Sequence, residues 1–416
     1  MKRSLTIGFV VLLVALLGAG VLAAEPIRVG VLVPQTGAFA GLGADGVEGV
    51  KLAFEEINYE IAGRPVQLFF EDTAADPTLA VQKTQRLVER EKVQLILGPL
   101  SGGSGLAVKE FAPRVPDVTI IVAGSASEDI TMRGVYPNVF RSSYSGAQVM
   151  FDLGRYAYEE LGLRRIATLG EDYAFPHTQI GGFIAAFLLA GGEVAERFWV
   201  PMGTTDFSSI FPRIPRDIDA MVVTLGGTDA INFLQQFDEY GLRDEITIIA
   251  GSTTVDATIL ETAGHLVEGV LSGSHYAQEL PYPEFKRFNE AFVERVGRSS
   301  SLFAADYYIA AQIAIEALNA IGGNIEDQDA FREALSNVKI DTPRGPFEFD
   351  AYNNVVLTVY INQVQFVDGE YKNVVIKSFP GVTQFGPFDP DWYESQPPFD
   401  RTNPTVETIK NAILAK

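Results

Sequence analysis

Two successive runs of alternating strand and helix patterns constrain the fold of this chain more than any other feature. The first run opens at Ile27–Val33, a short apolar segment rich in β-branched residues, and continues to a strand pattern at residues 118–122. After Arg141 the rhythm restarts, with strand patterns at residues 166–169, 220–225 and 246–250. Alternating strands and helices form parallel sheets with helices on both faces. The sequence therefore predicts an α/β protein with two Rossmann-like lobes and mostly parallel sheets.

The N-terminus has the pattern of an export signal. Lys2 and Arg3 precede an apolar run over residues 7–22, and small residues before Glu25 offer a cleavage point. We expect residues 1–24 to be a signal peptide and the mature protein to be periplasmic. An uncleaved anchor is the alternative, because the apolar run is nearly long enough to span a bilayer. The absence of cysteine argues against a lipoprotein and excludes disulfides and thiolate chemistry.

Charge and motif content argue against several classes of function. The 53 acidic residues outnumber the 32 basic ones, giving a formal net charge of −21, so we expect neither nucleic acid nor an anionic membrane surface as a partner. His177, His265 and His275 lack metal-ligand spacing. No G-x-S-x-G elbow and no phosphate-binding loop lysine occur. We therefore expect no catalytic residues, no cofactor and no metal.

One glycine pattern keeps an enzyme among the alternatives. Gly41, Gly43 and Gly46 match the dinucleotide pattern G-x-G-x-x-G, and Glu71 ends the next strand pattern. However, Gly41 comes eight residues after Val33, whereas the fingerprint needs a tight turn at the strand end. An exported NAD-dependent dehydrogenase is thus the weaker interpretation.

Six short segments together resemble a known family. In order and spacing they are similar to the periplasmic branched-chain amino-acid (Leu/Ile/Val-type) binding proteins of ABC importers, which have the type I periplasmic-binding fold. The segments are residues 33–43, 71–77, 98–102, 125–127, 171–175 and 342–350. The resemblance covers about residues 27–376 and leaves the C-terminal tail outside.

The resemblance implies two lobes joined by a three-strand hinge, with a ligand between them. We expect lobe 1 to comprise residues 25–141 and 276–350, and lobe 2 to comprise residues 142–275 and 351–377. In open α/β sheets ligands lie beyond the carboxyl ends of the strands, which agrees with this arrangement. The implied function is that of a solute-binding protein that delivers a small molecule to an ABC permease. We expect the ligand and the membrane subunits of the permease as its partners, and we expect the protein to be monomeric. A sensor or receptor subunit of the same fold is the alternative.

Two loops rich in small residues are the expected anion-binding elements. Small residues let backbone N–H groups approach an anion, and a helix N-terminus adds a favourable dipole. The resemblance implies that the first loop holds the ligand's carboxylate, although Gly102 stands where the family carries a serine. It also implies that the second loop offers a carbonyl, a hydroxyl and an N–H group. The residues concerned are Ser101, Gly102, Gly103 and Ser104 in the first loop and Ser125, Ala126 and Ser127 in the second.

The remaining expected ligand contacts form the walls of the site. The resemblance places apolar and aromatic side chains at Phe39, Leu42, Tyr173 and Phe175, and a further expected contact is Thr228. Core packing is the alternative for these apolar residues.

The residue at position 253 leaves the ligand class open. Amino-acid binders of this family place an acidic residue there to hold the ammonium group, and this chain has Thr253. An ammonium in a dry cleft needs an anionic or multiple-acceptor partner. The acids that could compensate are Glu171, Asp172, Asp229 and Asp256. A small amino acid and a carboxylate without an amino group therefore both remain possible ligands.

The last segment, residues 378–416, is rich in proline and aromatic residues. Disordered segments usually have few aromatic residues, so we expect this extension to pack on the surface of the lobes. A short helix should begin at Asn403 and bury Val406, Ile409 and Ile413 on one face. A flexible extension that reaches the permease is the alternative.

Overall fold

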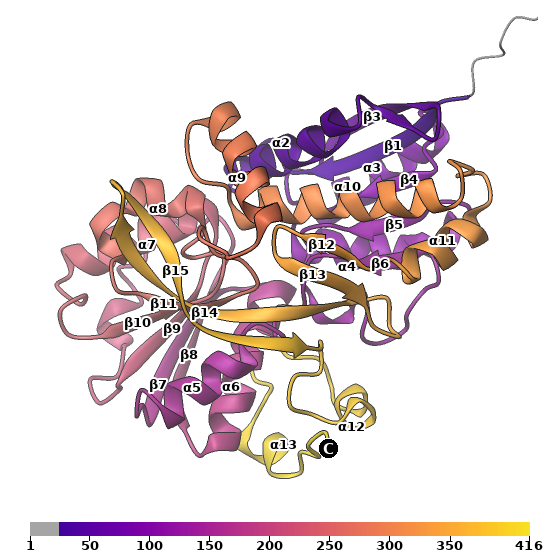
Figure 1. Ribbon diagram of the computed structural model, residues 1–416. Helices are drawn as coiled ribbons and strands as arrows, with labels where there is room; N and C mark the ends of the chain where they lie inside the picture. The colour runs from indigo at the N-terminus through magenta and orange to yellow at the C-terminus, as the bar shows by residue number, and fades with distance from the viewer. Residues whose placement is uncertain (1–24) are drawn as a thin grey trace, which may run out of the picture.

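The computed structural model describes residues 25–416, and the expected signal peptide, residues 1–24, lies outside them. The described chain forms two α/β lobes (Figure 1). No helix in this part of the chain is long and apolar enough to cross a membrane.

The first lobe is built on a six-stranded sheet in the order β2-β3-β1-β4-β5-β6, parallel except for β2. Helices α2, α3 and α4 connect its strands. The strand bounds are β1 Ile27–Val33, β2 Glu60–Ile61, β3 Arg64–Asp72, β4 Leu95–Leu97, β5 Thr119–Val122 and β6 Val139–Arg141, and the helices are α2 Ala40–Glu56, α3 Pro77–Glu89 and α4 Gly102–Phe111.

The second sheet has nine strands in the order β12-β13-β14-β11-β10-β9-β7-β8, with β15 paired to β14. Strands β7 to β11 are parallel, whereas β12 to β15 pair in antiparallel fashion. The strands are β7 Arg165–Glu171, β8 Glu193–Val200, β9 Ala220–Thr224, β10 Thr247–Ala250, β11 Leu271–Ser274, β12 Ile340–Thr342, β13 Gly345–Phe349, β14 Val355–Val367 and β15 Glu370–Val382; the helices between them are α5 Phe151–Glu159, α6 Ala174–Ala190, α7 Gly227–Glu239 and α8 Ala257–Ala263.

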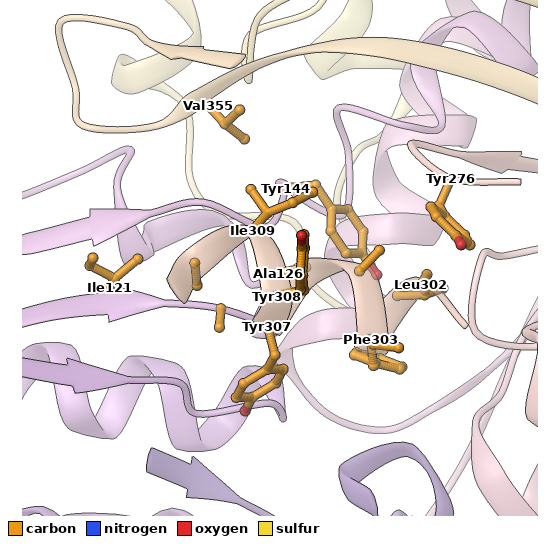
Figure 2. Packing of buried hydrophobic residues seen from close by; sticks show 14 of the residues in the cluster. Ile121, Ala126, Tyr144, Tyr276, Leu302, Phe303, Tyr307, Tyr308, Ile309 and Val355 are labelled. Carbon is orange, nitrogen blue, oxygen red and sulfur yellow. The ribbon is translucent and has the colours of Figure 1, made fainter. Parts of the chain in front are cut away.

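The chain returns to the first lobe after β11. Three helices follow there, and α10 packs along α2. Phe303 and Tyr307 of α10 lie in one buried cluster with Tyr144 and Ala126 (Figure 2). The helices are α9 Pro283–Val296, α10 Leu302–Ala320 and α11 Gln328–Ser336.

The glycines of the dinucleotide-like pattern serve helix packing. Gly41, Gly43 and Gly46 all lie inside α2, and the glycine in the turn between β1 and that helix is Gly37, which lies outside the pattern. A Cβ at Gly43 would lie 1.8 Å from the carbonyl oxygen of Pro34, and one at Gly46 would lie 2.8 Å from the Tyr307 ring. The absence of side chains at Gly43 and Gly46 thus lets α2 lie close against the loop after β1 and against α10.

A buried polar cluster joins the segments that connect the lobes. Arg344, in the turn between β12 and β13, donates to the carbonyl oxygens of Ser142 and Ser143 at 2.6 and 3.0 Å. Ser142 and Ser143 follow β6, and His275 follows β11. Asp306 of α10 accepts from Arg344 at 2.6 Å and lies 2.8 Å from His275 Nε2. These contacts tie two of the crossing segments to the first lobe.

The C-terminal extension packs against the rest of the protein. β15 continues to Val382, so the first residues of the segment expected to be irregular are in fact strand. Beyond it, Phe385, Phe388 and Tyr393 are buried in a cluster with Phe151. The yellow segment lies beside α6 in Figure 1. It contains the short helices α12 Pro390–Ser395 and α13 Val406–Lys410.

The prediction that three residues of the last helix are buried on one face is wrong for two of them. Ile409 is buried, but Val406 and Ile413 are 53% and 56% exposed. The helix also begins later than expected, because Thr405 caps it by accepting from Thr408 N at 3.1 Å. Its five residues are too short for three apolar side chains to share one buried stripe.

Candidate functional site

The candidate site is a cavity of about 300 Å³ between the two lobes. Carboxyl ends of β4, β5, β7, β9 and β10 supply most of its wall, as strand-end loops do in open α/β sheets. The lining residues are Phe39, Leu42, Leu100, Gly102, Gly124, Ala126, Tyr144, Tyr173, Phe175, Gly226, Thr253 and Phe303. None of these twelve residues carries a charge, so the cavity favours a ligand with a large apolar part.

Seven of the expected contact residues lie in this wall. They are Phe39, Leu42, Gly102, Ala126, Tyr173, Phe175 and Thr253. Six others do not line the cavity: Ser101, Gly103, Ser104, Ser125 and Ser127 lie behind or beside the wall, and Thr228 is exposed on α7. Phe39, Leu42 and Phe175 also belong to the central apolar core, so wall and core are continuous here.

The serines of the two loops have different hydrogen-bonding states. Ser101 caps α4, accepting from Ser104 N, and its hydroxyl donates to the carbonyl of Ala75 at 3.1 Å. The Ser125 hydroxyl donates to the Ser101 carbonyl at 2.6 Å. Ser127 Oγ, by contrast, is buried and has no hydrogen-bond partner in the described chain. Of these serines, Ser127 therefore has an unpaired hydroxyl in the described chain.

Because Gly102 has no side chain, the unpaired hydroxyl of Ser127 lies at the edge of the cavity. A Cβ at Gly102 would lie 2.3 Å from Ser127 Oγ and 2.7 Å from Phe175 Cβ. A serine at this position, as in the family, would therefore clash with both residues. Gly102 is also the first residue of α4, whose first N–H groups have no acceptor within the helix. This corner thus combines a helix N-terminus with one unpaired hydroxyl.

The opposite wall comes from the second lobe. Tyr173 and Gly226 are the N-cap residues of α6 and α7, so two more helices begin at the cavity. The Gly226 N–H is engaged, since it donates to Glu171 Oε1 at 3.2 Å. The Thr253 hydroxyl donates to the Leu225 carbonyl at 3.0 Å. The Gly226 N–H and the Thr253 hydroxyl of this wall are therefore already engaged.

Two buried carboxyl groups lie behind the Gly226 wall. Glu171 ends β7, and Asp229 in the first turn of α7 accepts from the N–H groups of Gly203 and Thr204 at 2.7 and 3.1 Å. Burial and the neighbouring Asp229 charge raise the pKa of Glu171 to about 8. Burial also raises the pKa of Asp229. Glu171 therefore holds its proton at neutral pH, which keeps this side of the cavity from becoming strongly negative.

The other acids that could have held an ammonium group have structural partners. Asp256 caps α8, accepting from Thr258 N at 3.1 Å, and also accepts from Leu302 N at 3.1 Å. Asp172 accepts from Arg401 and lies 3.0 Å from His177 Nε2. None of the four acids lines the cavity. Among residues 25–416 there is also no group of three or more His, Asp or Glu residues that could hold a metal ion.

Sequence reasoning missed five lining residues, of which Tyr144 is the most informative. Its hydroxyl lies 3.2 Å from Ser252 Oγ, and its ring stacks on His275 at 4.2 Å between centroids. Tyr144 lies just after β6, a three-residue strand that the sequence pattern did not reveal. His275, one of the three histidines without metal-ligand spacing, is fully buried. Leu100, Gly124, Gly226 and Phe303 were also missed, although the first three follow expected strands.

Comparisons with known proteins agree with this fold. The family model described as "Periplasmic binding protein" matches residues 26–370. An ABC transporter substrate-binding protein from Sphaerobacter thermophilus is 34% identical, with a TM-score of 0.81 over 86% of this chain and 99% of its own. A solute-binding protein of an ABC transporter from Rhodopseudomonas palustris, solved with 3,4-dihydroxybenzoic acid, is 30% identical, with a TM-score of 0.81 over 86% and 98% of the two chains.

A curated relative is similar to this chain in sequence over nearly its whole length. The "Leu/Ile/Val-binding protein homolog 6" of Brucella melitensis is 28% identical over 372 residues, which are 87% of this chain and 94% of the relative. These relatives are solute-binding proteins, not enzymes. The chain therefore belongs to the periplasmic binding protein family and has the type I fold of the branched-chain amino-acid binding proteins.

Proposed function

We propose that this protein is the extracytoplasmic substrate-binding component of an ABC importer and that it binds a small aromatic carboxylate. The observation that carries the proposal is the composition of the cavity wall: five of its twelve residues are aromatic and none is charged. The family membership supports the coarser part, a substrate-binding protein that passes its ligand to a permease in the membrane.

The aromatic wall suits a flat ring. Phe39, Tyr144, Tyr173, Phe175 and Phe303 surround the cavity, and aromatic pairs prefer offset or edge-to-face contacts that a benzoate-sized ring can make. The empty space between these side chains is about 300 Å³, including the solvent at the opening, so the site is narrow. A narrow site favours a small flat ring with few substituents over a bulky ligand.

The carboxylate has a place at the first-lobe corner of the cavity. The start of α4 at Gly102 offers N–H groups and a positive dipole end, and the unpaired Ser127 hydroxyl adjoins it. On the second-lobe side, Thr253 replaces the acid that would hold an ammonium group. The relative from Rhodopseudomonas palustris, solved with a dihydroxybenzoic acid, supports the same ligand class.

A direct ligand screen tests the proposal. Isothermal titration calorimetry on the mature, refolded protein should compare benzoate, 4-hydroxybenzoate and 3,4-dihydroxybenzoate with leucine, isoleucine and valine. Refolding matters because a tightly held ligand could otherwise block the site. We expect binding of at least one aromatic acid and weaker binding of the amino acids. Tight binding of a branched-chain amino acid with no response to the aromatic acids would refute the proposed ligand class.

A further inference from the structure

The C-terminal strap, residues 383–416, makes contacts with both lobes. The family match ends at residue 370, before this segment begins. Its cluster of buried side chains includes Met132 from the first lobe and Phe151 and Ala185 from the second. A segment that contacts both lobes of a hinged protein can restrict the movement of one lobe relative to the other.

One set of contacts fixes the strap to the second lobe. Arg401 Nε donates to Asp172 Oδ1 at 2.7 Å, and a second nitrogen of the same guanidinium contacts Asp172 Oδ2. The indole N–H of Trp199 in β8 donates to the Arg401 carbonyl at 3.2 Å. The Phe399 ring packs on α6, where a Cβ at Gly181 would lie 2.4 Å from Phe399 Cγ. The segment 399–401 therefore moves with this lobe.

Another set of contacts fixes the same part of the strap to the first lobe. Phe399 N donates to Glu128 Oε2 at 3.2 Å, and Glu128 is buried. Arg133 donates to the carbonyl oxygens of Tyr393 and Glu394, each at 3.2 Å. Glu128 and Arg133 lie between β5 and β6, within the first lobe. Phe399 thus has its ring on one lobe and its backbone N–H on the other.

Both anchor residues are direct neighbours of the candidate ligand site. Glu128 follows Ser127, whose free hydroxyl adjoins the cavity, and Asp172 precedes Tyr173, which lines it. The strap therefore joins the two rims of the cavity through residues only two positions apart in its own sequence. Three residues of extended chain span at most about 10 Å, so the link is short.

From these contacts we infer that Phe399 and Arg401 are positioning residues for lobe closure, and that the strap is a clasp that holds the lobes together at the ligand cavity. In type I binding proteins ligand exchange requires the lobes to separate about their hinge. With Arg401 bound to Asp172 and Phe399 bound to Glu128, separation must break one of these contacts. Breaking the Glu128 contact leaves a buried carboxyl group without its N–H donor, which opposes opening.

The distance between the lobes in the ligand-free protein tests this inference. The chain has no cysteine, so spin labels can be attached specifically at Glu110→Cys in the first lobe and Glu239→Cys in the second, both exposed. Electron–electron double resonance should be recorded for this labelled protein with wild-type Arg401, Arg401→Ala, Asp172→Asn and Arg401→Lys. The matched control is Arg216→Ala, which breaks an exposed ion pair to Glu245 within the second lobe.

We expect a second population with a longer interlobe distance in Arg401→Ala and Asp172→Asn, and its reduction in Arg401→Lys, which keeps a cation. Arg216→Ala should give the wild-type distribution. A distribution unchanged in both strap variants, or widened equally in Arg216→Ala, would overturn the inference.

A kinetic measurement extends the test to ligand exchange and relies on the proposed ligand class. Stopped-flow dissociation of 4-hydroxybenzoate should become roughly threefold to fivefold faster in Arg401→Ala, the size expected for a partly exposed ion pair. An unchanged rate would overturn the inference as well. Because the distance measurement needs no ligand, failure of the protein to bind aromatic acids would refute the proposed function and leave the clasp to be judged by that measurement.

Discussion

Arg344 donates a hydrogen bond to Asp306 over 2.6 Å at the hinge, where the two side chains are 3% and 0% exposed. Asp306 also lies 2.8 Å from His275, whose ring stacks on Tyr144 of the cavity wall. A buried ion pair thus connects the hinge to the candidate ligand site through two aromatic rings. Burial lowers the pKa of His275, so the ring is neutral and Asp306 has a single full cationic partner.

We predict that Asp306→Asn lowers the free energy of unfolding by about 3–5 kcal/mol, because it leaves the buried Arg344 charge without its counterion. Urea unfolding followed by circular dichroism measures the change. The control is Glu245→Gln, which breaks an exposed ion pair with Arg216 and should change the stability by less than about 1 kcal/mol. Equal effects of the two substitutions would show that the buried hinge pair contributes no more to the free energy of unfolding than an exposed ion pair.

Ser127→Ala should weaken aromatic-acid binding by about 1–3 kcal/mol, the range for a hydrogen bond to a charged group. It should leave the stability of the ligand-free protein unchanged or slightly higher, because the hydroxyl has no partner there. Ser125→Ala is the matched control: its hydroxyl donates to Ser101 O at 2.6 Å, so its loss should lower stability first. Calorimetry and thermal unfolding separate the two effects, and unchanged affinity in Ser127→Ala would remove this residue from the site.

Gly102→Ser, which restores the residue typical of the family, should reduce affinity by more than about tenfold. The new Cβ would lie 2.3 Å from Ser127 Oγ and 2.7 Å from Phe175 Cβ, so both must move away from the cavity. Gly41→Ala is the control, since a Cβ there has no heavy atom within 4 Å. Wild-type affinity in Gly102→Ser would mean that the serine is accommodated and that this corner is not close-packed.

Glu171 should make stability fall as the pH rises. Its pKa is raised from 4.5 to about 8 in the folded protein, so the unfolded chain loses this proton in mild acid while the folded chain keeps it. Between these values the unfolded chain binds fewer protons, and the contribution of Glu171 to stability falls by about 1.4 kcal/mol per pH unit. Above a pH of about 8 the contribution is constant.

The measurement is the difference in unfolding free energy between wild type and Glu171→Gln across this pH range. The difference reports Glu171 together with its coupling to the neighbouring Asp229, whereas Asp256, whose pKa is also raised by burial, is common to both proteins. We expect Glu171→Gln to become progressively more stable than wild type as the pH rises. Glu239→Gln, at the exposed end of α7, is the control and should run parallel to wild type. A pH-independent difference for Glu171→Gln would contradict the prediction.

The sequence predicted the two-lobe α/β fold because the strand patterns of its parallel core are continuous apolar runs separated by helix patterns. β1 has the expected bounds, Ile27–Val33. Two of the missed strands are different in character: β6 has three residues, and β8 is largely half-exposed with charged residues at Glu193, Glu196 and Arg197. Neither pattern stands out from loop sequence. The lobe boundaries and the monomeric state remain predictions.

The sequence predicted lining residues of the candidate site only in the loops that directly follow predicted strands. Tyr144 and Phe303 were missed because a crossing segment and α10 bring them to the cavity from distant parts of the sequence. The sequence also does not tell which side-chain hydroxyls already have hydrogen-bond partners. Ser101, Ser125 and Ser127 are the same amino acid, and only the structure shows which hydroxyl is unpaired. The roles of these residues in binding also remain predictions.

Thr253→Glu should exchange one ligand class for the other. Thr253 is 5% exposed and lines the cavity, and the resemblance to amino-acid binders implies an acid at this position. A carboxylate there places a negative charge in an otherwise uncharged cavity, where it repels an anionic ligand and offers a partner to an ammonium group. We expect the affinity for aromatic acids to fall by at least about tenfold, equivalent to 1.4 kcal/mol, and measurable leucine binding to appear. Thr253→Gln, similar in size but uncharged, is the control: calorimetry showing equal losses of aromatic-acid binding in both variants would attribute the effect to size and contradict the charge argument.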